Sequence, residues 1–151
     1  RDACYRMQTS WMIEDKMTWN EIIAACREAG PHRGACFQSL GRDLSPLARA
    51  GAADTVASVC FDLPSEERSQ CLKGAVFALT DHTWDGRSAY PFCAIANTPE
   101  LRAECFLTAH RNLLDVLEQP PEPLVVQCQK YARENPECLE TLRVARESAV
   151  P

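Results

Sequence analysis

The nine cysteines of this chain alternate between short and long separations, and this alternation constrains the fold more than any other feature of the sequence. They stand at Cys4, Cys26, Cys36, Cys60, Cys71, Cys93, Cys105, Cys128 and Cys138. All but the first form four short pairs, and from one pair to the next the first cysteine advances by 34, 33 and 35 residues. A period near 34 residues is typical of stacked helical hairpins.

Other residue types follow the same period. Arginine stands three residues before the second cysteine at Arg1, Arg33, Arg68 and Arg102, and the last copy has Asn135. Apolar residues directly follow that cysteine at Tyr5, Phe37, Leu72, Phe106 and Leu139, and lie eight residues after it at Met12, Leu44, Leu79 and Leu113. Four residues before the first cysteine stand Ile22, Val56, Ala89 and Leu124, and each pair encloses one proline, Pro31, Pro64, Pro99 or Pro136. The agreement indicates an internal repeat.

The apolar spacing within a unit is helical. Cys36, Phe37, Leu40 and Leu44 fall on one face of a helix with 3.6 residues per turn. Each unit therefore predicts a first helix that ends near the first cysteine, a turn with proline, and a second helix that begins near the second cysteine. In the third unit, Thr98 is the expected N-cap, with proline at the first helical position.

This hairpin geometry places the two cysteines of a pair side by side. The last turn of one helix meets the first turn of the next, within the Cα separation of about 5.5–6 Å that a disulfide needs. We therefore expect the bridges Cys26–Cys36, Cys60–Cys71, Cys93–Cys105 and Cys128–Cys138. Cys4 aligns with the second cysteine of each pair and is expected to be unpaired within the chain. The chain is expected to start within a repeat, with the partner of Cys4 upstream of Arg1; the alternatives are that Cys4 is free or bonded to another chain.

The predicted fold class is all-α, an α-solenoid of about four helical hairpins with a period of about 34 residues and one intra-hairpin disulfide per repeat. A single helical-repeat domain would cover 1–151, with a half unit at roughly 1–17 and full units at 18–50, 51–86, 87–119 and 122–151. The stretch "EQPPEPLV" at 118–125 is expected to be a stiff proline linker. Arg146, where earlier copies have Met or Leu, is expected to belong to a polar terminal cap.

Composition narrows the functional classes. The net charge is −5 and the basic residues are scattered, so no nucleic-acid surface is expected. No apolar run approaches the roughly 20 residues that span a bilayer, so no membrane-spanning segment is expected in this chain. The cysteines are many and contain no C-x-x-C pair, which favours disulfides over metal ligands and predicts a periplasmic or extracellular location.

By its period and hairpin pattern, the chain resembles α-solenoids of the tetratricopeptide type, and is similar to cysteine-rich secreted relatives in which a disulfide staples each hairpin. The W-x-x-L-G-x-x-Y pattern is absent, and "SLGRDL" at 39–44 matches only its Leu-Gly dipeptide. The resemblance is architectural, so no family binding residues are carried over. It implies protein or peptide binding in a groove.

The segment "DHTWDGRSAYPFC" supplies the candidate binding residues, His82, Trp84, Arg87, Tyr90 and Phe92. Aromatic and arginine side chains dominate protein-interface hot spots, which favours a binding epitope. The alternative is a connection whose aromatic residues pack between the second and third units.

The two other histidines have modest expected roles. His32 is expected in a solvated turn, and His110 on a helix that faces solvent or a neighbouring repeat. The repeated arginine opposes the dipole of the helix that it begins, so we expect it to pair with an acid or a helix C-terminal carbonyl of a neighbouring unit.

The sequence thus predicts a non-catalytic secreted or periplasmic scaffold, adaptor or accessory subunit of a larger envelope complex. It would act by binding a protein partner, including one in a membrane-associated complex. No catalytic residue, metal or cofactor is expected on this interpretation. Two alternatives stay open, a metal or cofactor carrier that uses Cys and His, and a hydrolytic enzyme with its site near His82.

Overall fold

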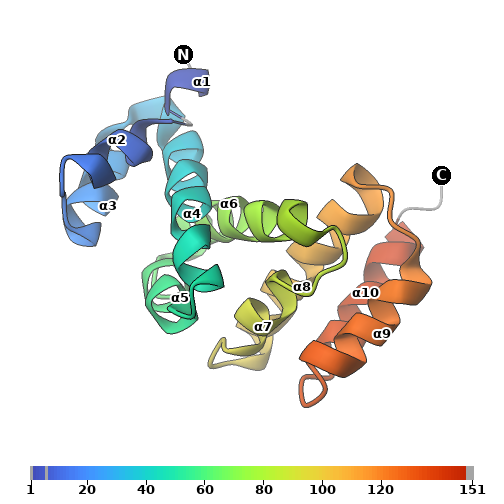
Figure 1. The fold of residues 1–151 in the computed structure, drawn as a ribbon. Coiled ribbons are helices and arrows are strands. Elements are labelled where there is room, and N and C mark those ends of the chain that lie inside the picture. Colours follow the sequence, from blue (N-terminus) through green and yellow to red (C-terminus); the bar gives the residue numbers. More distant parts are fainter. Residues whose placement is uncertain (1, 6, 149–151) are drawn as a thin grey trace. The chain divides into compact units, whose positions relative to one another are not determined.

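The structure is a computed structural model that describes residues 2–5 and 7–148 (Figure 1). All regular structure in these ranges is helical, with no strand, so the all-α fold class is confirmed. The chain divides into two compact units, Arg1–Ala75 and Val76–Pro151, and each is described by itself. Over the same described ranges, no helix combines the length and the apolar character that crossing a membrane requires.

Unit 1 holds the blue-to-green elements of Figure 1. Its elements are α1 (Asp2–Tyr5), α2 (Gln8–Glu14), α3 (Trp19–Glu28), the 3-10 turn η1 (Gly30–His32), α4 (Arg33–Arg49), α5 (Ala53–Phe61) and the first part of α6 (Ser65–Thr83). Helix α4 is the centre of the unit, because α2, α3 and α5 all pack against it. Pro31 lies in η1 between α3 and α4, in the turn where the repeat predicts it.

Local sequence explains where the helices of unit 1 begin and end. Thr18 and Glu21 form a capping box at the start of α3, in which each side chain bonds the other residue's backbone N–H. Helix α2 is followed by Lys16 and α4 by Gly51, both with positive φ, the left-handed conformation that commonly ends helices. For Gly51 this conformation carries no side-chain penalty.

Unit 2 runs from the end of α6 to the C-terminal helix. Its further elements are α7 (Ala89–Ala94), α8 (Pro99–Arg111), the π-helical turn η2 (Asn112–Val116), α9 (Pro121–Tyr131) and α10 (Glu137–Ser148). Helix α10 packs against both α8 and α9, and α7 packs against α8. The predicted N-cap is present, because the Thr98 hydroxyl accepts a hydrogen bond of 3.2 Å from the backbone N–H of Leu101.

The proline-rich stretch at 118–125 differs from the prediction. Helix α9 begins at Pro121, so only the first part of the stretch is a connection. Pro121 and Pro123 lie in the first turn of the helix, where the backbone N–H that proline lacks has no intrahelical partner. The prediction of a linker over the whole stretch was therefore wrong.

The repeat positions form the core of both units. Residues eight after the second cysteine are all buried (Met12, Leu44, Leu79 and Leu113), and so are those four before the first cysteine (Ile22, Val56, Ala89 and Leu124). Directly after the second cysteine, Phe37, Leu72 and Phe106 are fully buried, whereas Leu139 is 42% exposed. The terminal hairpin thus exposes an apolar position that internal hairpins bury. Arg146 is exposed.

Four disulfides staple the hairpins. They are Cys26–Cys36, Cys60–Cys71, Cys93–Cys105 and Cys128–Cys138, the pairs that the spacing predicts. The Cα atoms of each pair are 5.3–5.7 Å apart, as a disulfide requires. Cys4 is a free and exposed cysteine.

Helices of successive hairpins also meet each other at equal offsets from the second cysteines. In unit 1, the hydroxyl oxygens of Thr9 and Ser39 lie 2.6 Å apart, and in unit 2 His110 Nδ1 lies 3.1 Å from Thr141 Oγ1. Each contact joins the residue five after one second cysteine to the residue three after the next. Gly41 and Gly74 have the same two offsets, and there the backbones of α4 and α6 touch directly.

Candidate functional site

An open groove of about 540 Å³ lies between α3 and α5 in unit 1. One wall comes from the start and the outer face of α3, the other from the end of α5 and the residues after it. The lining residues are Thr18, Trp19, Asn20, Ile23, Arg27, Ser58, Val59, Asp62 and Leu63. On α3 the lining side chains recur about every four residues, so they share one face of that helix.

The groove combines an aromatic and apolar base with polar edges. Trp19 and Ile23 are half-buried, while Asn20, Ser58 and Asp62 are exposed. Because the capping box fixes the first turn of α3, Trp19 and Asn20 project from a rigid position. An exposed amide next to an indole can bond a peptide backbone while an apolar side chain packs on the ring.

A buried carboxylate fixes Arg27 at the groove. Glu67 is 3% exposed, and the Arg27 guanidinium donates to it through Nε at 3.0 Å and Nη2 at 2.8 Å. Arg33 also pairs with Glu67. The hydrogen bonds from Arg27 outweigh the effect of burial and, together with Arg33, hold the pKa of Glu67 below its ordinary value. Two arginines against one carboxylate leave this cluster with one net positive charge.

The repeated arginines form two kinds of contact. Arg33 pairs with Glu67, and Arg102 with Glu137 at 2.9 Å, so each contacts an acid in the following hairpin, as we hypothesised. Arg68 donates to the Leu63 carbonyl oxygen at 3.2 Å, in the turn before its own helix, and Arg102 donates in the same way to the Ala96 carbonyl oxygen at 3.0 Å. Arg1 lies outside the described residues.

The predicted epitope residues of unit 2 divide between surface and core. His82 is exposed, Trp84 is 54% exposed and Arg87 lies on the surface, whereas Tyr90 and Phe92 are buried. The Tyr90 ring packs edge-on against Phe106 and His110, with centroids 5.9 and 5.3 Å away. The structure therefore does not present the five side chains together on one surface.

Hydrogen bonds to Asp85 hold the exposed part of this loop. Asp85 accepts the Arg87 backbone N–H at 3.0 Å and the Arg87 guanidinium at 2.6 Å, and it lies 3.3 Å from the amide nitrogen of Gln127. Burial opposes ionisation of Asp85, but the hydrogen bonds from Arg87 outweigh it and lower the pKa of the carboxyl. Gly86 has φ of +81°, and a side chain there would press on the Tyr90 ring.

An apolar hollow of about 540 Å³ surrounds the free cysteine. It is lined by Cys4, Tyr5, Met7, Gln8 and Trp11. Met7 and Trp11 are 60% and 62% exposed, which is high for side chains of this size and polarity. Tyr5 stacks on His32 with ring centroids 4.6 Å apart. This contact covers part of the His32 ring, so the side chain is half-buried and not fully solvated as expected.

Comparisons of the chain with protein-family models, with curated proteins and with solved structures found no match. Support for the candidate site therefore comes from its geometry alone.

The sequence prediction missed the groove between α3 and α5. It placed binding residues in the segment with the most aromatic side chains, and two of those fill the core instead. The signal that could have found the groove is "TWNE" at 18–21, in which a capping box directly precedes an aromatic and an amide side chain.

Proposed function

We propose that the protein is a non-catalytic helical-repeat scaffold or accessory subunit that binds a segment of another protein in the groove between α3 and α5. The groove is the observation that carries this proposal, because it offers an aromatic base, an exposed amide and a fixed cation on a stapled framework. Helical-repeat proteins commonly bind in such inter-hairpin surfaces.

The chemistry of the groove defines the segment that it would accept. An apolar or aromatic side chain would pack on Trp19 and Ile23, and the Asn20 amide would bond the backbone. A carboxylate would approach Arg27, where the cluster with Arg33 and Glu67 keeps one net positive charge. The proposed partner is therefore a protein segment that carries an acidic group close to an apolar anchor.

Equal contacts in the two units support the helical-repeat interpretation. Thr9 with Ser39 in unit 1 and His110 with Thr141 in unit 2 occupy the same two offsets from their cysteines. Such equivalence is expected if the second helices of successive hairpins stack in one register. On this proposal the chain is a cysteine-rich solenoid of the tetratricopeptide type.

The disulfides support a periplasmic or extracellular location, in which the scaffold serves a larger envelope complex. Oxidising compartments maintain structural disulfides, whereas reducing compartments rarely do. Differential thiol labelling of the protein in its native cells tests this location, because a cytosolic protein would show all its thiols free.

Site-specific photo-crosslinking in native cells tests the groove. A benzoyl-phenylalanine replaces Asn20 or Ser58 in the groove, and Glu14 or Arg49 at exposed control positions of the same unit. We expect the two groove positions to capture the same protein, and Arg27→Ala to reduce that capture. Identical adducts from groove and control positions would refute the proposed binding groove.

A further inference from the structure

A buried histidine faces the disulfide of the last hairpin. His110 Nε2, near the end of α8, lies 3.8 Å from Sγ of Cys128, which is bridged to Cys138. One nitrogen of His110 and the two sulfur atoms all lie within 4.8 Å of one another. Exposure is 0% for His110, 1% for Cys128 and 0% for Cys138, so the cluster belongs to the interior of unit 2.

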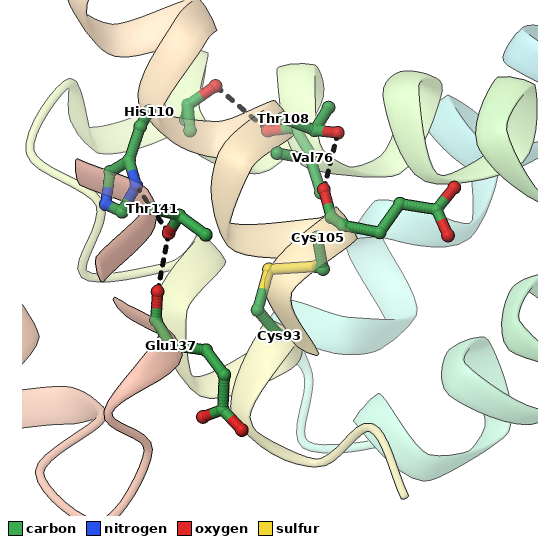
Figure 2. Close-up of a disulfide and its surroundings, with 9 residues drawn as sticks. Val76, Cys93, Cys105, Thr108, His110, Glu137 and Thr141 are labelled. Carbon is green, nitrogen blue, oxygen red and sulfur yellow. Dashed lines mark hydrogen bonds between the residues drawn. A yellow bond between two sulfur atoms is a disulfide. The ribbon is translucent and has the colours of Figure 1, made fainter. Parts of the chain in front are cut away.

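Hydrogen bonding fixes the tautomer of this histidine. The Thr141 hydroxyl donates its single hydrogen to a backbone carbonyl, that of Glu137 at 2.6 Å (Figure 2). Its oxygen is then the acceptor for His110 Nδ1 at 3.1 Å, so the ring proton lies on Nδ1. Nε2 therefore carries a lone pair, and this lone pair faces Cys128.

The imidazole is held in the way that metal-binding histidines are held. Such histidines usually donate their other ring N–H to an oxygen that keeps the ring in place. The chain from His110 through Thr141 to the Glu137 carbonyl has that arrangement.

We propose that opening of Cys128–Cys138 creates a binding site for one thiophilic divalent cation, with Zn²⁺ as the simplest occupant. A dithiol reductant exchanges with the disulfide, becomes a disulfide itself and leaves two thiols on the protein. The cation then binds both sulfur atoms and His110 Nε2, and the two thiols release two protons. In the oxidised protein the sulfur atoms bond each other, and the site is closed.

Distances support this site. With Zn–S of about 2.3 Å and Zn–N of about 2.0–2.1 Å, a tetrahedral site places sulfur and nitrogen about 3.6 Å apart. His110 Nε2 and Cys128 Sγ are already 3.8 Å apart, so the histidine needs little movement. The two sulfur atoms must separate to about 3.8 Å, which breaking their bond allows.

Charge favours a divalent ion over Cu⁺. Two thiolates and a neutral imidazole cancel the charge of Zn²⁺, whereas Cu⁺ would leave one negative charge in the interior, where an uncompensated charge is costly. Three protein ligands leave a fourth position for water, as in zinc sites that bind exogenous ligands. In the part of the chain that the structure describes, no other cysteine pair has been found with a third ligand of this kind.

The test uses the full chain with Cys4→Ser, which removes the ninth thiol. The protein is reduced without oxygen, freed of reductant and mixed with one equivalent of Zn²⁺. Alkylation followed by peptide mapping then compares the four cysteine pairs. We expect Zn²⁺ to slow alkylation of Cys128 and Cys138 at least tenfold and to leave the other three pairs unchanged.

Variants test His110 as the third ligand and Thr141 as the group that orients it. His110→Phe should abolish the selective protection, and Thr141→Val should weaken the affinity for Zn²⁺ about 10–100-fold, since it removes the group that orients the imidazole. Thr108→Val is the matched control. Thr108 lies on α8 and its hydroxyl bonds the Glu104 carbonyl, so its loss should leave the affinity unchanged (Figure 2).

Co²⁺ provides an independent reading, because one equivalent should give the visible absorption of a tetrahedral site with sulfur ligands. If the reduced chain loses its helices, the same ions should restore the far-ultraviolet circular dichroism in a manner that requires His110. Equal protection of all four pairs, unchanged binding by His110→Phe, or failure of the ions to bind or refold the reduced chain would each overturn the proposal.

Discussion

Alanine in place of Gly41 should destabilise the protein, although alanine is the better helix former. A Cβ atom on Gly41 would overlap the carbonyl oxygen of Cys71 and lie 2.8 Å from the backbone nitrogen of Ala75. Both are backbone atoms of α6, so neither can rotate away, and α4 would have to move. Overpacking of this kind costs about 1–3 kcal/mol.

The expected size follows from two opposing effects. In a helix interior, alanine is favoured over glycine by roughly 0.5–1 kcal/mol. Because the obstacle is backbone, we place the packing cost at the upper end of its range and expect a net loss of about 2 kcal/mol in the free energy of unfolding. The mirror change, Gly74→Ala, should be similarly costly, since its Cβ would overlap the carbonyl oxygen of Gln38.

The same helix supplies a matched control. Gly34→Ala, also in α4, would bring its Cβ only to ordinary contact with Gln70, at 3.6 Å. This variant should gain roughly 0.5 kcal/mol from helix propensity. Urea unfolding followed by circular dichroism, with the disulfides intact, measures both variants. If Gly41→Ala were as stable as Gly34→Ala, the close approach of α4 and α6 would not exist as described.

Three further predictions concern charge, the disulfides and the free thiol. Arg27 and then Arg33 hold the folded-state pKa of Glu67 below its unfolded value, so the ionised form adds stability that is fully present above about pH 4.5 and disappears as the pH falls through the folded-state pKa. Glu67→Gln should lower the free energy of unfolding by about 1–2 kcal/mol at pH 7 and by progressively less in acid. Urea titrations that show the same loss at pH 7 and at pH 3 would contradict this. Replacing both Cys60 and Cys71 by alanine should lower the free energy of unfolding by about 3 kcal/mol, because a bridge over a separation of 11 residues no longer restricts the unfolded chain. Thermal unfolding that matches the wild type would contradict this. A chromogenic disulfide reagent should titrate one thiol per native chain and none in Cys4→Ser, and a second reactive thiol would show that a bridge is open.

Much of the fold could be predicted because the positions that recur with the cysteine spacing are also apolar. The positions of Ile22, Val56 and Leu124 were identifiable as core from spacing alone, and they are buried. Bridges between cysteines 10–12 residues apart follow from the hairpin, since the turn brings the two helix ends together. Local chemistry also identified the Thr98 cap.

Predictions were poorer where the neighbour of a side chain decided its role. Tyr90 and Phe92 were expected in an epitope but are buried, and the Tyr90 ring packs on Phe106 of the next helix, α8, a contact that the spacing of the residues does not indicate. For His110 the sequence left two positions open, facing solvent or facing a neighbouring repeat. Solvent was wrong, because His110 is fully buried against Thr141 and Cys128 of the following hairpin, and no single-sequence pattern decided between the two. The groove beside Trp19 likewise depends on the spacing between two helices, which periodicity does not determine.

The locality of the disulfides has a consequence for how the chain is made. Eight cysteines can pair in 105 ways, yet each bridge here closes within 10–12 residues. At about 5–20 residues synthesised per second, the correct partner emerges roughly half a second to two seconds after its mate, and before the next pair appears. Oxidation of these eight cysteines can therefore proceed in order along the nascent chain, so that mispairing among them has little time to occur and the need for disulfide reshuffling between hairpins is low.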